Sequence, residues 1–240
     1  MNQHIVEHLF RFWREIGRLG GFIHQGMEYD YTAPDQKSWP SKVFGLKTSG
    51  LYIDSLKDGI RAEVIPNSVG IHEDEEMGTQ LLNQGFVLTS SVAAMSMDAT
   101  GGNFEPETYI AQIERVDSDE KARIFADVAS QSFGYPVLET TISPLHKRQS
   151  FKLFLGKLGN FYCSCGIVYL DKDKVAGIHM IGTLPEFRGR GLGKIMTKHL
   201  IQVAQKNESQ QIFLVASEAG ERIYSKMGFK KHGVLQSYSL

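Results

Sequence analysis

Arg188-Gly189-Arg190-Gly191-Leu192-Gly193-Lys194 is the stretch that decides the fold. It follows a β-like run from Val175 to Thr183 and precedes a helix-like run from Ile195 to Lys206. Glycines at alternate positions let the backbone turn sharply and aim successive N–H groups at one point. A helix that begins directly afterwards adds unpaired N-terminal amides and the positive end of its dipole. With its three basic side chains, the stretch predicts a binding site for a phosphate or pyrophosphate.

The spacing of the glycines narrows the choice of ligand. A nucleotide P-loop reads Gly-x-x-x-x-Gly-Lys-Ser/Thr, whereas Lys194 follows a Gly-x-Gly-x-Gly run and precedes Ile195, so no hydroxyl is placed to hold magnesium. A dinucleotide loop reads Gly-x-Gly-x-x-Gly near the start of a long βαβ series, and this loop has a different third spacing and lies late in the chain. Both readings are rejected. A solvated basic surface turn remains the alternative, and the flanking elements must decide.

The composition excludes several classes of protein. The chain has 240 residues, of which 42% are hydrophobic, and this is enough for one large domain or two modest ones with a proper core. Lys and Arg number 26 against 27 Asp and Glu, so the global basic field usual in nucleic-acid binding is absent. No apolar run approaches the roughly 20 residues that span a bilayer, and the N-terminus lacks a signal pattern. We therefore expect a soluble, cytoplasmic protein, monomeric or homodimeric, that binds neither nucleic acid nor membrane.

Cysteine is scarce and carries no chemistry that the sequence can identify. Cys163 and Cys165 are the only two, and their spacing within a strand-like run places both side chains on one face. A metal site would need a further pair of Cys or His residues at ligand spacing, which is missing. We expect two buried, reduced thiols and no metal.

Periodicity and turn residues predict a smaller N-terminal α/β domain. The expected elements are a helix over 4–19, a turn-rich segment over 26–50 with a short strand over 42–46, a strand over 59–66, a helix over 73–84 and a strand over 87–97. The small, polar stretch Ala99-Thr100-Gly101-Gly102-Asn103 reads as a linker. We place the boundary there, with one domain over 1–103 and the other over 104–240.

The second domain is predicted to be a mixed, mainly antiparallel α/β (α+β) sheet flanked by helices. Its expected elements are a strand over 109–116, a helix over 120–133 capped by Asp117-Ser118-Asp119, strands over 151–158, 161–170 and 175–183, the helix to 206, a strand over 212–216, a helix over 218–227 and a strand over 229–235. The turn Asp171-Lys172-Asp173-Lys174 joins two of these strands as a hairpin. The sheet is therefore built around the glycine loop.

One short pattern occurs in both predicted domains. Leu81-Leu82-Asn83-Gln84-Gly85-Phe86-Val87 and Tyr224-Ser225-Lys226-Met227-Gly228-Phe229-Lys230 share a helix, a Gly-Phe pair and a strand in the same order. Gly-Phe after a helix is a common C-cap with a hydrophobic anchor, so the repeat is either coincidence or the trace of a duplication.

The pattern Arg188-x-x-Gly191-x-Gly193 after Thr183-Leu184-Pro185, combined with Tyr224-x-x-x-Gly228-Phe229, resembles the GNAT superfamily of acetyl-CoA-dependent N-acetyltransferases. The likeness covers about residues 107–236. It implies a GNAT-type sheet in which the strand before the loop splays from its neighbour and binds the pantetheine arm through its backbone. By position, the resemblance assigns the pantetheine to Ile181, Gly182 and Thr183. It assigns the pyrophosphate to Arg188, Gly189, Arg190, Gly191, Leu192, Gly193 and Lys194. If the repeat is real, the N-terminal domain is a degenerate GNAT-like half, to which we assign no cofactor.

The chemistry that the resemblance implies is attack of a neutral amine on a thioester. It needs a base for the amine, amide donors for the oxyanion and an acid for the departing thiolate. Tyr224 matches the position of the acid, because a phenol with a pKa of about 10 is protonated at neutral pH; the alternative is a tyrosine at the edge of the core. Ser217 stands where many relatives carry a cofactor-binding asparagine, and it reaches less far.

The general base is not identified. Gly177 stands where some relatives hold a glutamate, and it has no side chain to take a proton. His179 and His146 are substitute candidates, although a lone histidine is more often structural and the amine can lose its proton to water.

Two functions are consistent with these residues. The first is an acetyl-CoA-dependent N-acetyltransferase that transfers the acetyl group directly, in a ternary complex, to a primary amine of a small molecule or peptide. The second is a CoA-binding regulatory or interaction module without turnover, which the missing base and Ser217 suggest. A different acyl donor is a third reading, because the loop recognises only the pyrophosphate. The acceptor depends on loops over 24–41 and 134–150, which carry no motif.

Overall fold

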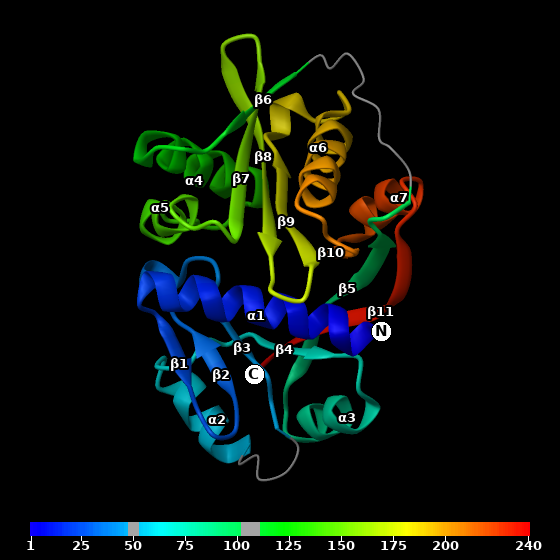
Figure 1. The fold of residues 1–240 in the computed structure, drawn as a ribbon. Helices are drawn as coiled ribbons and strands as arrows, with labels where there is room; N and C mark the ends of the chain where they lie inside the picture. Colours follow the sequence, from blue (N-terminus) through cyan, green and yellow to red (C-terminus); the bar gives the residue numbers. More distant parts are fainter. Residues whose placement is uncertain (48–52, 102–110) are drawn as a thin grey trace. The chain divides into compact units, whose positions relative to one another are not determined.

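The structure of the protein is a computed structural model, and it describes residues 1–47, 53–101 and 111–240. The chain divides into two compact units (Figure 1). The first unit contains Met1–Met95 and Val215–Leu240, and the second contains Ser96–Leu214. Helices flank mostly antiparallel strands in both, which confirms the predicted mixed α/β class.

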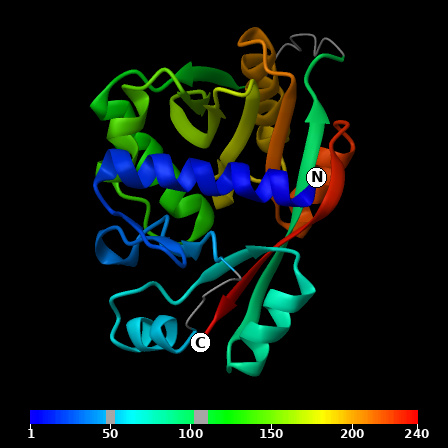
Figure 2. The same ribbon diagram turned by 60° about the horizontal axis from the view of Figure 1, so that its bottom comes forward.

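The first unit has the strand order β1-β2-β3-β4-β11-β5. Its elements are α1 (Asn2–Gly20), β1 (Ile23–Gln25), β2 (Asp30–Thr32), the 3-10 turn η1 (Asp35–Lys37), β3 (Lys42–Phe44), α2 (Ile53–Arg61), β4 (Val69–His72), α3 (Glu75–Asn83), β5 (Val87–Asp98), α7 (Glu218–Ser225) and β11 (Lys230–Ser239). The strands β3 and β4 are parallel and are connected through α2, whereas β11 runs antiparallel to β4. Figure 2 shows β11, in red, beside β4 and β5.

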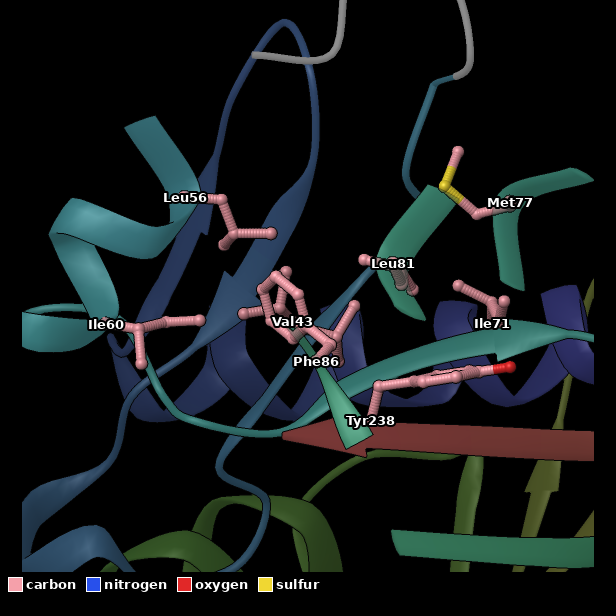
Figure 3. Close-up of a cluster of buried hydrophobic side chains, with 9 residues drawn as sticks. Val43, Leu56, Ile60, Ile71, Met77, Leu81, Phe86 and Tyr238 are labelled. Carbon is pink, nitrogen blue, oxygen red and sulfur yellow. The ribbon is translucent and has the colours of Figure 1, made fainter. Parts of the chain in front are cut away.

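The core of the first unit is formed by residues far apart in the sequence. Strands, helices and the Gly-Phe turn each contribute to one buried cluster (Figure 3), which comprises Val43, Leu56, Ile60, Val69, Ile71, Met77, Leu81, Phe86 and Tyr238. The predicted N-terminal helix is confirmed as α1, which buries the stripe Ile5, Leu9, Phe12 and Ile16 and ends at Gly21 in the left-handed conformation. Long-range packing therefore connects the chain's two ends within this unit.

The predicted strand over 59–66 is wrong. Residues 59–61 are the last turn of α2, and residues 62–65 form turns in which the N–H groups of Val64 and Ile65 donate to the carbonyl of Gly59. The helix forms because Leu56 and Ile60, four residues apart, both lie in the buried cluster. The strand of this region comes later, at β4, and the sequence pattern also missed α2, β1 and β2.

The second unit has the strand order β10-β9-β8-β7-β6. Its elements are β6 (Gln112–Arg115), α4 (Asp119–Phe133), α5 (Glu139–His146), β7 (Phe151–Leu158), β8 (Phe161–Leu170), β9 (Val175–Thr183), η2 (Pro185–Phe187), α6 (Leu192–Lys206) and β10 (Gln211–Ala216). The predicted strands over 151–158, 161–170 and 175–183 are confirmed at both ends. The strand predicted over 109–116 is found as β6, and its first two residues lie outside the described residues. The helix α5 was not predicted.

Two helices cover opposite faces of the second unit's sheet. A Cβ on Gly166 would meet Met196 and Leu200 of α6, whereas a Cβ on Gly182, which pairs with Cys165, would meet Ser132 of α4. Adjacent strand residues point to opposite faces, so Cys163 and Cys165 share the α4 face. Both are buried free thiols, as predicted.

The boundaries of the compact units differ from the predicted domain boundary. The unit boundaries fall after Met95 and Leu214, because β11 pairs with β4 and so packs the last segment of the chain with the first. The predicted boundary after residue 103 stays a prediction, since packing units and inherited domains need not coincide. Residues 102 and 103 of the predicted linker lie outside the described part of the chain.

The repeated Gly-Phe pattern has the same backbone in both places. The N–H of Gly85 donates to the carbonyl of Leu82, and that of Phe86 donates to Leu81. In the second copy the N–H of Gly228 donates to Ser225, and that of Phe229 donates to Tyr224. Both are Schellman motifs, with glycine φ values of 88° and 98°.

The repeat extends beyond the turns. The parallel pair β3 and β4 is connected through α2 and followed by α3 and β5, and the parallel pair β9 and β10 is connected through α6 and followed by α7 and β11. The element order β3-α2-β4-α3-β5 therefore recurs as β9-α6-β10-α7-β11. That the N-terminal half is a degenerate GNAT-like domain stays a prediction.

Candidate functional site

The strands β9 and β10 pair over only part of their length. Their parallel register joins Val175, Ala176 and Gly177 of β9 to Gln211, Ile212 and Phe213 of β10. Residues 178–183 of β9 have no partner in β10, and both strands are fully described. The backbone at the C-terminal end of β9 is therefore open on one edge, which is the splay that the resemblance implied. An extended amide-containing chain can hydrogen-bond to such an edge.

A β-bulge in β9 lies within this open segment. Cys165 of β8 is opposite Gly182, and Ile167 is opposite His179, so β9 holds one more residue than β8 between these pairs. Met180 takes up the excess with a φ of 53°, in the left-handed region that non-glycine residues rarely adopt. Its carbonyl accepts a hydrogen bond from the Cys165 thiol at 3.4 Å. Strained backbone of this kind concentrates at functional sites.

The loop after β9 has the conformation that its glycines predict. Gly189 and Gly191 have φ values of 77° and 78°, and a Cβ on either would meet nothing within 4 Å, so both face open space. The helix α6 then begins at Gly191 with no side-chain cap and no acidic residue in its first turn.

Three other helices begin differently, whereas α1 resembles α6 in having neither a side-chain cap nor an acidic first turn. Side chains of Asp74, Ser118 and Ser217 cap α3, α4 and α7, and acidic residues follow in each first turn. A capping oxygen fills the position that an anionic ligand would take, and acidic side chains repel it. The bare N-terminus of α6 therefore fits a phosphate group.

The three basic side chains of the loop have different surroundings. The Arg188 guanidinium donates to the backbone carbonyls of Ser132 at 2.7 Å and Thr183 at 3.2 Å, so it fastens the loop to α4 and to the end of β9. The Arg190 guanidinium lies 5.4 Å from the ring centre of Phe187. Lys194 is exposed and has no ion pair with any described residue. Positive charge is thus available mainly from Lys194 and Arg190.

The remaining predicted cofactor residues of the second unit lie on or beside this segment. Ile181 and Thr183 are half-buried in β9, and Gly182 packs too closely against Ser132 and Cys165 to carry a side chain. Leu192 is buried in the core beneath the loop, and Gly193 accepts a hydrogen bond from the Thr197 hydroxyl at 2.7 Å.

Two features of the site carried no signal in the sequence. The buried Ser132 Oγ beside Gly182 has no hydrogen-bond partner among the described residues. The bulge at Met180 is the other. Both depend on which residues face each other across the sheet, and no residue pattern records that.

Tyr224 and Ser217 belong to α7, in the first unit. Tyr224 is half-buried, and its ring meets that of Phe229 edge-on with centres 6.0 Å apart. The exposed Ser217 accepts the N–H of Gly220 at 3.3 Å as the N-cap of α7. The serine therefore keeps the helix-capping role for which asparagine is also suited.

Neither of the two histidines that the sequence suggested has an evident role as base in the described part of the chain. His146 is hydrogen-bonded to Asp119 at 3.0 Å, in a cluster with Lys147 and Ser143 that connects α5 to α4. His179 is buried in β9, and Gly177 pairs with both neighbouring strands. Burial raises the pKa of the Cys165 thiol to about 12, so it is not a nucleophile at neutral pH.

Within the described ranges, no three His, Cys, Asp or Glu side chains gather into a metal-binding group. Of the helices in the same ranges, none combines the length and apolar character needed to cross a bilayer.

Comparison with known proteins finds similarity to one family in the region around the loop. The model of the acetyltransferase (GNAT) family matches residues 119–229. An uncharacterized N-acetyltransferase of Methanocaldococcus jannaschii is 31% identical over 85 residues, which are 34% of this chain and 38% of the relative. One of Bacillus subtilis is 30% identical over 71 residues, which are 28% of this chain and 27% of the relative. The chain thus spans well under half the length of these curated relatives.

Solved structures match over nearly the whole chain. A GCN5-related N-acetyltransferase from Kribbella flavida has a TM-score of 0.72 at 16% identity, covering 94% of this chain and 92% of that one. Another from Sphaerobacter thermophilus has a TM-score of 0.66 at 15% identity, covering 94% and 84%. At these identities the likeness shows the fold alone.

Proposed function

Because residues 119–229 of this chain form a GNAT-family domain, we propose that the protein is an acetyl-CoA-dependent N-acetyltransferase. The acceptor in this proposal is a primary amine of a small molecule or peptide. The observation that carries it is the continuous run from the splayed, bulged end of β9 through the open glycine loop to the uncapped N-terminus of α6.

In this proposal, the end of β9 and the glycine loop bind different parts of acetyl-CoA. The open edge of β9 at Ile181, Gly182 and Thr183 binds the amide groups of the pantetheine arm through backbone hydrogen bonds. The amides of residues 189–194 bind the pyrophosphate with Lys194 and Arg190, while Arg188 holds the loop in place. The bare helix end and the open space at Gly189 and Gly191 fit such a ligand.

Bound acetyl-CoA supplies the thioester whose acetyl group is transferred. Amides near the bulge at Met180, which the β8 ladder cannot all pair, stabilise negative charge on the acyl oxygen. The role of Tyr224 as proton donor to the leaving thiolate, and that of Ser217 toward the cofactor, rest on the resemblance alone. The amine gives its proton to water in this proposal, because Gly177 offers no side chain.

An assay of cofactor binding and of acyl transfer to amines distinguishes this proposal from a CoA-binding module without turnover. Purified protein is titrated with acetyl-CoA by calorimetry, and CoA release is then followed with a panel of primary amines and peptide N-termini. We expect saturable binding and amine-dependent CoA release. Binding without transfer to any amine would favour the module, and absence of binding would exclude both. Longer acyl-CoA donors in the same assay establish the preferred acyl group.

A further inference from the structure

A pocket of about 190 Å³ lies entirely within the first unit. Its wall is formed by α1, the residues that follow β3, the end of β4 and the beginning of α3. The apolar part of the wall includes Val6, Phe10, Ile71 and Met77, which are all buried. At about 30 Å³ per water, the pocket has room for roughly six waters, or for a small ligand of similar size.

The pocket lies at the place that corresponds, in the repeated element order, to the cofactor segment. The parallel strands β3 and β4 are the counterparts of β9 and β10, and they share a single paired position, Val43 with Val69. Beyond that pair, Gly45 and Leu46 on one side and Gly70, Ile71 and His72 on the other line the pocket. The first unit thus keeps a cavity between two parting parallel strands.

The charges of this cavity differ from those of the glycine loop. Arg14 donates to Glu7 and to Asp30, each at 2.6 Å, so its single positive charge is shared by two carboxylates. Asp74 adds a third carboxylate, with the His72 ring nitrogen 3.9 Å from it. Glu75 and Glu76 follow in the first turn of α3. Of the charged residues that line the cavity itself, Glu7 and Asp74 are carboxylates and Arg14 is a guanidinium, so the lining favours a cation over a pyrophosphate.

We propose that this pocket binds a small organic cation, a primary ammonium ion on a short apolar chain. The ammonium group lies between Glu7 and Asp74, which offer charged acceptors, and the chain lies against Val6, Phe10, Ile71 and Met77. Arg14 stays paired with Asp30 and defines the polar end of the pocket. The proposal does not depend on acetyl transfer, because every residue involved belongs to the first unit.

Three probes that differ only in their head group test the proposal. n-Pentylamine, 1-pentanol and pentanoate are titrated separately into the full chain without CoA, and the methyl resonances of Ile71 and Met77 are followed by NMR. We expect saturable shifts with pentylamine, binding at least tenfold weaker with pentanol and none with pentanoate. Pentylamine that leaves these two resonances unmoved overturns the proposal, even where it binds elsewhere on the protein. Tighter binding of pentanoate overturns it too.

Charge-removing variants identify the recognising groups. Glu7→Gln keeps an acceptor for Arg14, and Asp74→Asn keeps an N-cap for α3, so both preserve the local hydrogen bonds. We expect the double variant to bind pentylamine at least tenfold more weakly. Glu15→Gln removes one carboxylate charge from α1 outside the pocket, as Glu7→Gln does inside it, and should change affinity less than twofold. If the double variant binds pentylamine as tightly as the parent protein and its amide spectrum is unchanged, the proposal is wrong. The CoA-release assay tests the acetyltransferase proposal separately, so either proposal can fail without the other.

Discussion

The two Schellman turns of the first unit have the same backbone and different side chains at the same position. Leu81, which accepts the hydrogen bond of Phe86, is 0% exposed within the core cluster. Tyr224, which accepts that of Phe229, is half-buried. One copy of the turn therefore places a fully buried leucine in the core, and the other places a half-buried tyrosine at the same position. The repeated backbone fixes the position of the Cα atom, and the elements packed around it determine whether the side chain is buried in the core or partly exposed.

The two repeats also differ in the residues that cap their helices and in the loops that precede α2 and α6. Asp74 and Ser217 cap α3 and α7, so both copies satisfy the same helix end with different side chains. The glycine loop before α6 has no counterpart in the sequence before α2, where residues 45–52 read Gly-Leu-Lys-Thr-Ser-Gly-Leu-Tyr. The glycine loop therefore distinguishes the two repeats more clearly than their order of helices and strands does.

The largest expected effect comes from closing the glycine loop. Gly191→Leu places a side chain where the open amides face the pyrophosphate, and we expect acetyl-CoA affinity to fall at least a hundredfold by calorimetry. The matched control is Gly85→Leu in the first copy, because Gly85 also has a positive φ and open space around its Cβ. Each variant should lose roughly 1–2 kcal/mol of unfolding free energy from the left-handed backbone. Equal cofactor affinity in the two variants would show that the loop does not bind the cofactor.

Truncating Leu81, the buried residue of the first Schellman turn, should affect stability alone. Leu81→Ala leaves a cavity in the buried cluster, and we expect a loss of about 2–5 kcal/mol in the free energy of unfolding, measured with urea. The acetyl-CoA affinity of the folded protein should stay within a factor of two. A loss below 1 kcal/mol would mean that the cluster collapses around the missing side chain.

Removing the hydroxyl of Tyr224, at the same position of the second Schellman turn, should affect turnover alone. Tyr224→Phe keeps the ring that contacts Phe229 and removes the hydroxyl, so we expect unfolding free energy and acetyl-CoA affinity to stay nearly constant. If the phenol donates a proton, kcat should fall by about a hundredfold, measured as CoA release at saturating substrates. Unchanged kcat would make Tyr224 a packing residue, as Leu81 is.

Local patterns predicted most of the second unit correctly. The hairpin turn at Asp171–Lys174 and the alternation of its strands specify β8 and β9, and Ser118 is the N-cap of α4 as expected. The first unit was harder: the strand predicted over 42–46 is found as β3, but β1 and β2 are three residues long and too short to show a period. The error over 59–66 has a similar cause, since Ile60, Ala62 and Val64 alternate acceptably for a strand although Ile60 belongs to a helix face.

The sequence by itself determined the conformation of the glycine loop, because the glycine spacing acts through local backbone geometry. It also predicted the Gly-Phe turns, since a Schellman motif closes within a few residues. The tertiary structure alone decided the bulge at Met180, the engagement of Arg188 with two carbonyls and the pairing of β11 with β4. These depend on which distant segments meet, and burial and hydrogen bonding across the sheet select that arrangement only when the whole chain is folded.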